Sequence, residues 1–284
     1  MSKKEKVTLE EKLIKDGWFE NEKEIQAWLM SRLILVDNEV MTSGKIKILA
    51  DSEIRVKEYY KKRFVNKGGL KLEKAIQEFN INIQNKVALD CGASTGGFTD
   101  CLLYYGAKKV YAVDVGFGQL AGKLLQDNRV VNLERTNLSD TILLNLEEKP
   151  EIISLDLSYL SLKKAVPICR NIISDDRGIL ICLVKPLYEV ESAEIKRTGN
   201  INDENILETV LVDLYEYFKA MGYYIKGITN SPITGNKGTV EFLFCLDFSM
   251  PCINENDDMM RQQIKAAVQN GIKLQKFDKK YINI

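Results

Sequence analysis

Short, almost continuously apolar runs alternate with longer amphipathic stretches through most of the chain after about residue 68. The apolar runs predict strands and the stretches between them predict helices. Strands are expected at 87–90, 110–114, 130–133, 152–156, 179–184, 224–228 and 240–246. Helices are expected just after Gly68-Gly69 and at about 97–105, 119–126, 162–173 and 204–221. Because these strands are apolar at nearly every position, we expect an α/β fold with a largely parallel sheet covered on both faces.

The end of this pattern differs from its middle. The last two strands are joined by the turn-rich segment 229–238, which predicts a hairpin and therefore an antiparallel element. Residues 251–284 form a polar tail in which nothing suggests chemistry. A helix is expected there at 257–268, with an apolar face made of Met260, Ile264, Ala267 and Val268 that packs against the sheet.

The first 60 residues follow a separate pattern. Two short helices are expected, one from Thr8 or Glu10 to Lys15 and one at 22–32, followed by short strands at 33–36, 40–41 and 53–56. Such a small core is expected to need a neighbour or a ligand to pack on. We therefore divide the chain into a small α+β module (1–60), a linker (61–67), a main domain (68–250) and a tail (251–284).

Charge is balanced overall but not locally. The 284 residues carry a net charge of zero, which neither favours nor excludes nucleic acid as a partner. From Arg55 to Lys74, however, eight basic residues stand against two acidic ones. The N-terminus lacks the apolar segment of a secretion signal, and no apolar run approaches the roughly 20 residues of a membrane span. We expect a cytoplasmic, soluble protein without a membrane partner.

Two residue types restrict the chemistry. The chain contains no histidine, which excludes Ser-His-Asp and Cys-His catalysis and any histidine base. Its six cysteines form no CxxC pair, so we expect reduced structural thiols and no metal site. Proton transfer must therefore depend on Lys, Asp, Glu, Tyr or Cys.

A glycine-rich turn follows the first strand of the main domain. Asp90 ends that strand, glycines follow at 92, 96 and 97, and a helix begins directly afterwards. Such a turn lets a ligand approach the backbone beside a helix N-terminus. The spacing is not the Gly-x-Gly-x-x-Gly of nicotinamide cofactors and better suits a ligand with a cationic amino-acid portion. Asp114, which ends the second strand, is placed to accept hydrogen bonds from ribose hydroxyls. The alternative is a tight turn without a ligand.

Further polar side chains stand near the ends of predicted elements. Asp156 and Lys185 each follow an apolar strand, where open α/β sheets bind their ligands. Lys71 lies after Gly68-Gly69, and Glu241 lies in the last predicted strand. Each also has a plain structural explanation: Lys71 as a solvated helix charge, Asp156 as a helix cap, and Glu241 as a strand-edge charge. From the residues alone, the plain explanation is favoured for Lys71 and Glu241.

The motifs together resemble those of the TlyA (hemolysin A-like) family, which is related to the FtsJ-type ribose methyltransferases. The resemblance runs over about residues 8–247, and its motifs are GGLKLEKA at 68–75, DCGASTGGFTDCL at 90–102, ERTN at 134–137 and SPITG at 231–235. It implies a Rossmann-like class I methyltransferase sheet with a small N-terminal α+β RNA-binding module of the αL type. It also implies S-adenosyl-L-methionine as cofactor and 2′-O-methylation of RNA, with ribosomal RNA (at cytidine in the family), free or in ribosomal subunits, as the expected substrate.

The resemblance also implies roles for individual residues. The Lys-Asp-Lys-Glu tetrad of FtsJ-type enzymes falls on Lys71, Asp156, Lys185 and Glu241, which replaces the plain explanations given above. The positions that match the family's cofactor site are Asp90, Gly92, Ser94, Thr95, Gly96, Gly97, Phe98, Asp114 and Asn137. Lys185 is expected to be the base, which requires its neutral amine. The charges of Lys71 and the sulfonium favour that form, whereas Asp156 and Glu241 oppose it and orient the amine.

The sequence departs from the family at several places, and two other functions remain open. Asn66-Lys67 replaces Ser-Arg, Leu187-Tyr188 replaces Gln-Phe, and the N-terminal module differs at Asn21-Glu22 and Arg32. A non-catalytic RNA- or ribosome-binding assembly factor would use the basic stretch alone. A membrane-active hemolysin would need an inserting segment, which the sequence does not contain. Oligomeric state is not indicated.

Overall fold

The computed structural model describes residues 5–16, 18–19, 21–30, 32–56, 63–174, 178–199, 201–251 and 257–281. The chain divides into two compact units, Met1–Arg63 and Phe64–Ile284. Each unit is described by itself. Residues 57–62, the centre of the basic stretch, lie outside the described residues.

The first unit packs two helices with two small sheets. Thr8 begins α1, because its side chain accepts a hydrogen bond from the backbone N–H of Glu11 and the Glu11 carboxylate accepts one in return. A core around Leu13, Ile25 and Ile34 joins the helices to the strands. The elements are β1 (Lys6–Thr8), α1 (Leu9–Lys15), α2 (Glu22–Met30), β2 (Ile34–Val36), β3 (Glu39–Val40), β4 (Lys47–Leu49) and β5 (Ile54–Val56). The predicted elements are confirmed, but the β1–β4 pair was missed, because three residues are too few to show an alternating pattern.

The second unit contains a seven-stranded sheet in the order β11-β12-β10-β9-β6-β7-β8. Its strands are β6 (Val87–Cys91), β7 (Lys109–Asp114), β8 (Val130–Glu134), β9 (Ile152–Leu155), β10 (Ile179–Val184), β11 (Tyr224–Asn230) and β12 (Phe242–Asp247). β12 lies between β11 and β10 and is antiparallel to both, while the remaining pairs are parallel. The predicted α/β, Rossmann-like sheet with an antiparallel closing element is therefore confirmed.

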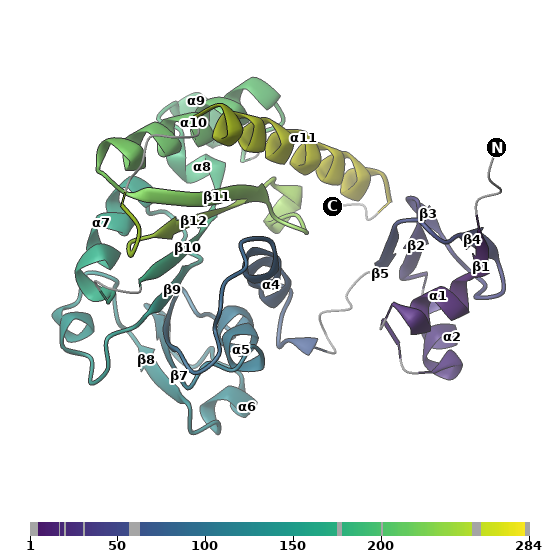
Figure 1. Cartoon of the computed structure of the whole chain (residues 1–284), viewed down its shortest axis with the longest axis horizontal. Coiled ribbons are helices and arrows are strands. Elements are labelled where there is room, and N and C mark those ends of the chain that lie inside the picture. Colours follow the sequence, from purple (N-terminus) through teal and green to yellow (C-terminus); the bar gives the residue numbers. More distant parts are fainter. Residues whose placement is uncertain are drawn as a thin grey trace. The chain divides into compact units, whose positions relative to one another are not determined.

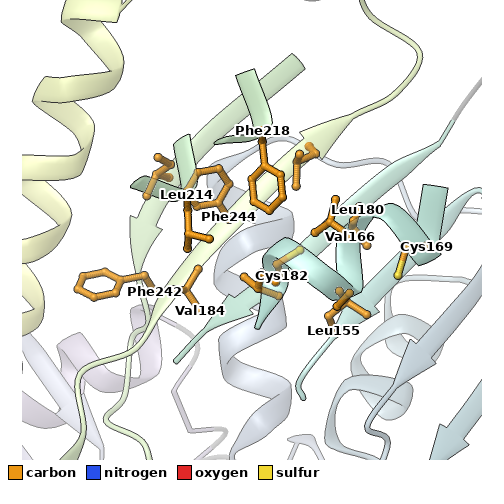
Figure 2. Close-up of a cluster of buried hydrophobic side chains, with 14 of the residues drawn as sticks. Leu155, Val166, Cys169, Leu180, Cys182, Val184, Leu214, Phe218, Phe242 and Phe244 are labelled. Atoms are coloured by element: carbon orange, nitrogen blue, oxygen red, sulfur yellow. The ribbon is translucent and has the colours of Figure 1, made fainter. Parts of the chain in front are cut away.

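Helices cover both faces of this sheet (Figure 1). They are α4 (Gly68–Glu78), α5 (Gly97–Tyr104), α6 (Gly122–Leu125), α7 (Leu162–Ile172), α8 (Pro186–Glu189), α9 (Ala193–Thr198), α10 (Glu204–Ala220) and α11 (Asp257–Tyr281), with short 3-10 turns η1 (Thr141–Asn145) and η2 (Asn236–Gly238). Side chains of successive strand residues alternate between two cores, one beneath α4 and α5 and the other beneath α7, α10 and α11. Figure 2 shows part of the second core, where Phe218 of α10 meets Phe244 of β12.

The tail contributes more to this unit than the sequence indicated. Met260, Ile264, Ala267 and Val268 are buried against the sheet, as predicted. The helix does not end at 268, however, but continues to Tyr281, and it lies along β11 (Figure 1). α6 is shorter than the predicted 119–126 helix. None of the helices within the described ranges has the length and apolar character needed to cross a membrane.

The cysteines that the structure describes, at positions 91, 101, 169, 182 and 245, are buried and form no disulfide. Burial raises the pKa of the Cys91, Cys169 and Cys182 thiols well above its usual value. Thiolate chemistry is therefore disfavoured there, and these side chains act as packing groups. Cys252 lies outside the described residues.

The topology fixes where a ligand is expected to bind. The chain continues from β6 to β7 and β8 on one side, and then returns to place β9 on the other side of β6. Open α/β sheets bind ligands at the carboxyl ends of strands where such a reversal occurs. The turn after β6 and the loop after β9 stand at that position.

Candidate active site

A cleft of about 820 Å³ opens at the carboxyl ends of the central strands. It is lined by the start of α4, the turn after β6, the loops after β9 and β10, and the segment around η2. Lys71, Asp156, Lys185 and Glu241 all line it. The structure thus brings together four side chains that are spread over 170 residues of sequence.

The four side chains form two ion pairs of different exposure. Lys71 Nζ lies 2.5 Å from Glu241 Oε2, and these side chains are only 7% and 5% exposed. Lys185 Nζ lies 2.6 Å from Asp156 Oδ1, and these are 20% and 24% exposed. Lys185 also donates a hydrogen bond to Ser158 Oγ at 3.3 Å. One pair is therefore a buried, fixed arrangement of charge, while the other presents its amine to the cleft.

Local structure explains how each partner reaches the cleft. Lys71 lies in the first turn of α4, which packs against β12. Glu241 is the residue just before β12, whereas the predicted strand at 240–246 included it. Its carbonyl accepts a hydrogen bond from Ser231 N at 2.8 Å, which closes the loop that joins β11 to β12. Lys185 directly follows β10 and precedes Pro186, the first residue of α8.

Gly92 lets two loops meet at the bottom of the cleft. Its φ is +85°, and a Cβ at this position would lie 2.3 Å from the carbonyl oxygen of Asp156. Asp156 N donates to Cys91 O at 3.0 Å, so the two strand ends are tied together at this point. Ser94, Gly97 and the start of α5 also line the cleft, and a helix N-terminus favours an anionic ligand group such as a carboxylate.

Asp114 stands at the end of β7 beside a smaller recess. Its two carboxylate oxygens accept hydrogen bonds from Ser94 N and Gly116 N, each at 2.7 Å. Each oxygen retains a further lone pair, which can accept a bond from a ribose hydroxyl. Gln119 and Asn132 also line this recess. The turn, the N-terminus of α5 and Asp114 together suit a ligand that combines an amino acid with a nucleoside.

Four positions from the family's cofactor site do not line the cleft or the recess. Asp90 is fully buried, and its carboxylate accepts hydrogen bonds from Thr99 Oγ1 (2.7 Å) and Ser154 Oγ (3.0 Å). The Asp90 side chain therefore holds the turn from behind in this structure, and a direct contact of its carboxylate with the cofactor stays a prediction. Thr95 Oγ1 accepts a hydrogen bond from Asn66 Nδ2, and Gly96 is buried. Asn137 is exposed, and its side chain accepts from Ser139 instead.

Stability is expected to depend on pH through Asp90. Burial raises the pKa of this carboxyl to about 7, while hydrogen bonds from Thr99 and Ser154 oppose the rise. Because the folded pKa exceeds the unfolded value, the group's contribution is present at low pH and is lost as pH rises through 7. Between pH 5 and pH 8, the unfolding free energy should therefore fall on the order of 2–3 kcal/mol more for the natural protein than for Asp90→Asn. Urea unfolding at both pH values measures this difference, and parallel pH curves would contradict it.

Several cleft residues were missed by sequence reasoning. Tyr159 is 89% exposed with a φ of +67°, and its ring lies 5.1 Å from that of Tyr188. Asn66 Oδ1 accepts a hydrogen bond from the N–H of Gly68, the first residue of α4, at 2.6 Å. Lys196 and Lys237 also line the cleft. These residues lie in loops or in very short helices, where no periodic pattern marks a position, so only the fold could assign their side chains to the site.

Comparisons with known proteins show which family the chain resembles. Residues 64–248 match the FtsJ-like methyltransferase family. The chain is 36% identical over 273 residues to YqxC of Bacillus subtilis, named as a candidate rRNA methyltransferase, covering 96% of this chain and 95% of that protein. It is 34% identical over 207 residues to the 16S/23S rRNA (cytidine-2′-O)-methyltransferase TlyA of Mycobacterium tuberculosis, covering 73% and 74%. A solved structure from Streptococcus thermophilus, named as a hemolysin, matches with a TM-score of 0.72 and 34% identity, covering 98% and 99%.

Proposed function

The chain belongs to the FtsJ-like methyltransferase family, an assignment that makes it an S-adenosylmethionine-dependent enzyme, and from this premise we propose that it methylates a ribose 2′-hydroxyl of ribosomal RNA. The observation that carries the proposal is the meeting of Lys71, Asp156, Lys185 and Glu241 in the cleft beside the glycine turn. The chain has no histidine, so a lysine-carboxylate site is a suitable means of handling the proton of a hydroxyl group.

S-adenosylmethionine supplies an electrophilic methyl group on a sulfonium. Gly92, Ser94, Gly97 and Phe98 would hold its amino-acid end, because they line the cleft beside the N-terminus of α5. Asp114 would accept hydrogen bonds from its ribose hydroxyls. Asn137 and Thr95 are not assigned a contact.

Lys185 acts on the hydroxyl that receives the methyl group. Methyl transfer is an in-line displacement, so the hydroxyl oxygen must be held in one direction while its proton is removed. The Lys185 amine lies at the cleft surface, whereas the Lys71 amine is buried against Glu241. Lys185 is therefore the lysine placed to accept the proton, and Asp156 and Ser158 orient its amine. To accept the hydroxyl proton, Lys185 must first release one proton of its ammonium to solvent, and the neutral amine would then take up the hydroxyl proton while the methyl group is transferred.

The Lys71–Glu241 pair has a different role. Both charges are desolvated and paired with each other, so they form a fixed dipole at one wall of the cleft. A fixed dipole stabilises charge that develops in the transition state without having to reorganise. We assign these two residues to positioning and electrostatic stabilisation.

RNA binding is assigned to three regions. Tyr159 and Tyr188 place two aromatic rings beside Lys185, where they suit stacking on the base of an unpaired nucleotide. The basic residues at 55–67 suit contacts to phosphates. The N-terminal unit, with its own core, is proposed as the RNA-binding module.

The proposal is tested by mapping 2′-O-methyl positions in ribosomal RNA from cells with and without the gene. Loss of at least one methylated ribose, restored by the intact gene but not by a Lys185→Ala copy, is the expected result. Identical maps would overturn the proposed substrate. Calorimetry with S-adenosylmethionine separates the enzyme from a non-catalytic assembly factor, since only the enzyme needs to bind it.

A further inference from the structure

The η2 loop has an unusual backbone where it lines the cleft. Lys237 and Gly238 follow one another with φ values of +58° and +70°. The left-handed region costs a residue with a side chain roughly 1–2 kcal/mol, and such strain persists only where surrounding contacts enforce it. The left-handed conformation of Lys237 therefore needs an explanation, whereas a glycine at this position would adopt it without strain.

Helix α11 supplies part of the contacts that hold this loop. Gln275 is 2% exposed, and its Nε2 donates to the carbonyl oxygen of Gly238 at 2.9 Å. One turn earlier, Gly271 packs so closely on Val240 that a Cβ there would lie 2.5 Å from Val240 Cγ1. Gly235 N also donates to Thr239 O at 2.8 Å, which closes the loop at its base. The part of the tail beyond the predicted helix thus supports a loop of the active site.

The residues that line the cleft carry an excess of positive charge, and Lys237 of this loop contributes to it. They include five lysines against two carboxylates, an excess of three positive charges in a chain with no net charge. Both carboxylates are already paired, Glu241 with Lys71 and Asp156 with Lys185. A positive excess at an exposed loop suits the phosphates of a polyanion.

We propose that Gln275 is a positioning residue that fixes the η2 loop and thereby presents Lys237 to a phosphate of the RNA chain bound in the cleft. This inference rests on the proposed function and names a contact of the same site. It assigns α11, which lies beyond the residues matched to the methyltransferase family, a role in binding the substrate.

The test compares three single variants and one double variant of the full chain in methyl transfer to ribosomal RNA from cells that lack the gene. Lys237→Gln removes the charge from an exposed site, and Gln275→Leu removes the supporting hydrogen bond at similar volume. Gln263→Leu is the matched control, because this residue of the same helix accepts a bond from Ile228 N of β11, away from the loop. Tm and S-adenosylmethionine affinity report whether each variant is folded.

Lys237→Gln should raise KM for RNA roughly tenfold and leave kcat and cofactor affinity unchanged, as expected for one lost charged hydrogen bond. The salt dependence of RNA binding should weaken by about one counterion. Gln275→Leu should raise KM about three- to fivefold, and adding it to Lys237→Gln should produce no further rise, because both act on one contact. Gln263→Leu should leave KM unchanged.

Three results would overturn the inference: an unchanged KM in Lys237→Gln, equal KM changes in the two glutamine variants, or a lower Tm in Gln275→Leu without a change in KM. If the natural protein itself transfers no methyl group, that result contradicts the proposed function and not the Lys237 contact. The affinity of the same variants for RNA then tests the Lys237 contact separately.

Discussion

Replacing Lys185 with alanine is expected to lower the rate of methyl transfer to RNA by about 10²–10⁴-fold, the contribution typical of a positioned proton acceptor. The variant loses the amine that lies at the cleft surface and contacts Asp156 and Ser158. Its affinity for S-adenosylmethionine should remain within about twofold of the natural value, because the glycine turn and Asp114 are untouched. Single-turnover transfer and calorimetry measure the two quantities.

Two further variants make this test specific. Lys185→Arg keeps the positive charge but cannot act as a base near neutral pH, so it should be nearly as inactive as alanine. Lys164→Ala removes an exposed lysine of α7 that does not line the cleft, and it should transfer at the natural rate. Full activity in Lys185→Ala would refute the assignment. Substantial activity in Lys185→Arg would show that charge, rather than proton acceptance, is what matters.

The second large effect concerns stability. Glu241→Ala leaves the Lys71 ammonium buried without its partner, which should lower the unfolding free energy by about 3–5 kcal/mol. The double variant Lys71→Met with Glu241→Leu replaces both charges with apolar groups of similar size. It should recover most of that stability, because the desolvation cost of the pair disappears as well. Its methyl transfer should remain impaired, because the fixed dipole is lost.

Urea unfolding and the transfer assay on the same preparations separate the two roles of the pair. A single variant as stable as the natural protein would show that the pair is not desolvated in solution. A double variant with natural activity would show that Lys71 and Glu241 contribute only to folding. Neither result would affect the assignment of Lys185.

The sheet, and the meeting of Asp156 with Lys185 in the cleft, could be predicted from the sequence. Apolar runs indicated the strands, and the carboxyl ends of neighbouring parallel strands meet at one edge, which brings Asp156 and Lys185 together. The pairing of Lys71 with Glu241 could not be predicted in this way. The two residues are 170 positions apart, and the contact depends on β12 entering between β10 and β11. Only the family resemblance indicated it.

At two positions the structure differs from what the sequence pattern predicts. The sequence predicts that Asp90 ends its strand, but the strand continues to Cys91, and the Asp90 carboxylate accepts hydrogen bonds from hydroxyl groups of α5 and β9. Those partners are distant in sequence, so no local pattern reveals them. Gln275 lies in a polar tail, and its burial follows from tertiary packing against the loop before β12. Polar composition alone therefore concealed its contact with the active site.

The central claim is that this cleft transfers a methyl group to a ribose hydroxyl. The most direct test incubates the protein with methyl-labelled S-adenosylmethionine and unmodified ribosomal RNA, digests the RNA to nucleosides and locates the label by mass spectrometry. The account predicts label in a 2′-O-methylnucleoside with the natural protein and none with Lys185→Ala. Label on a base, or equal labelling with both proteins, would contradict it.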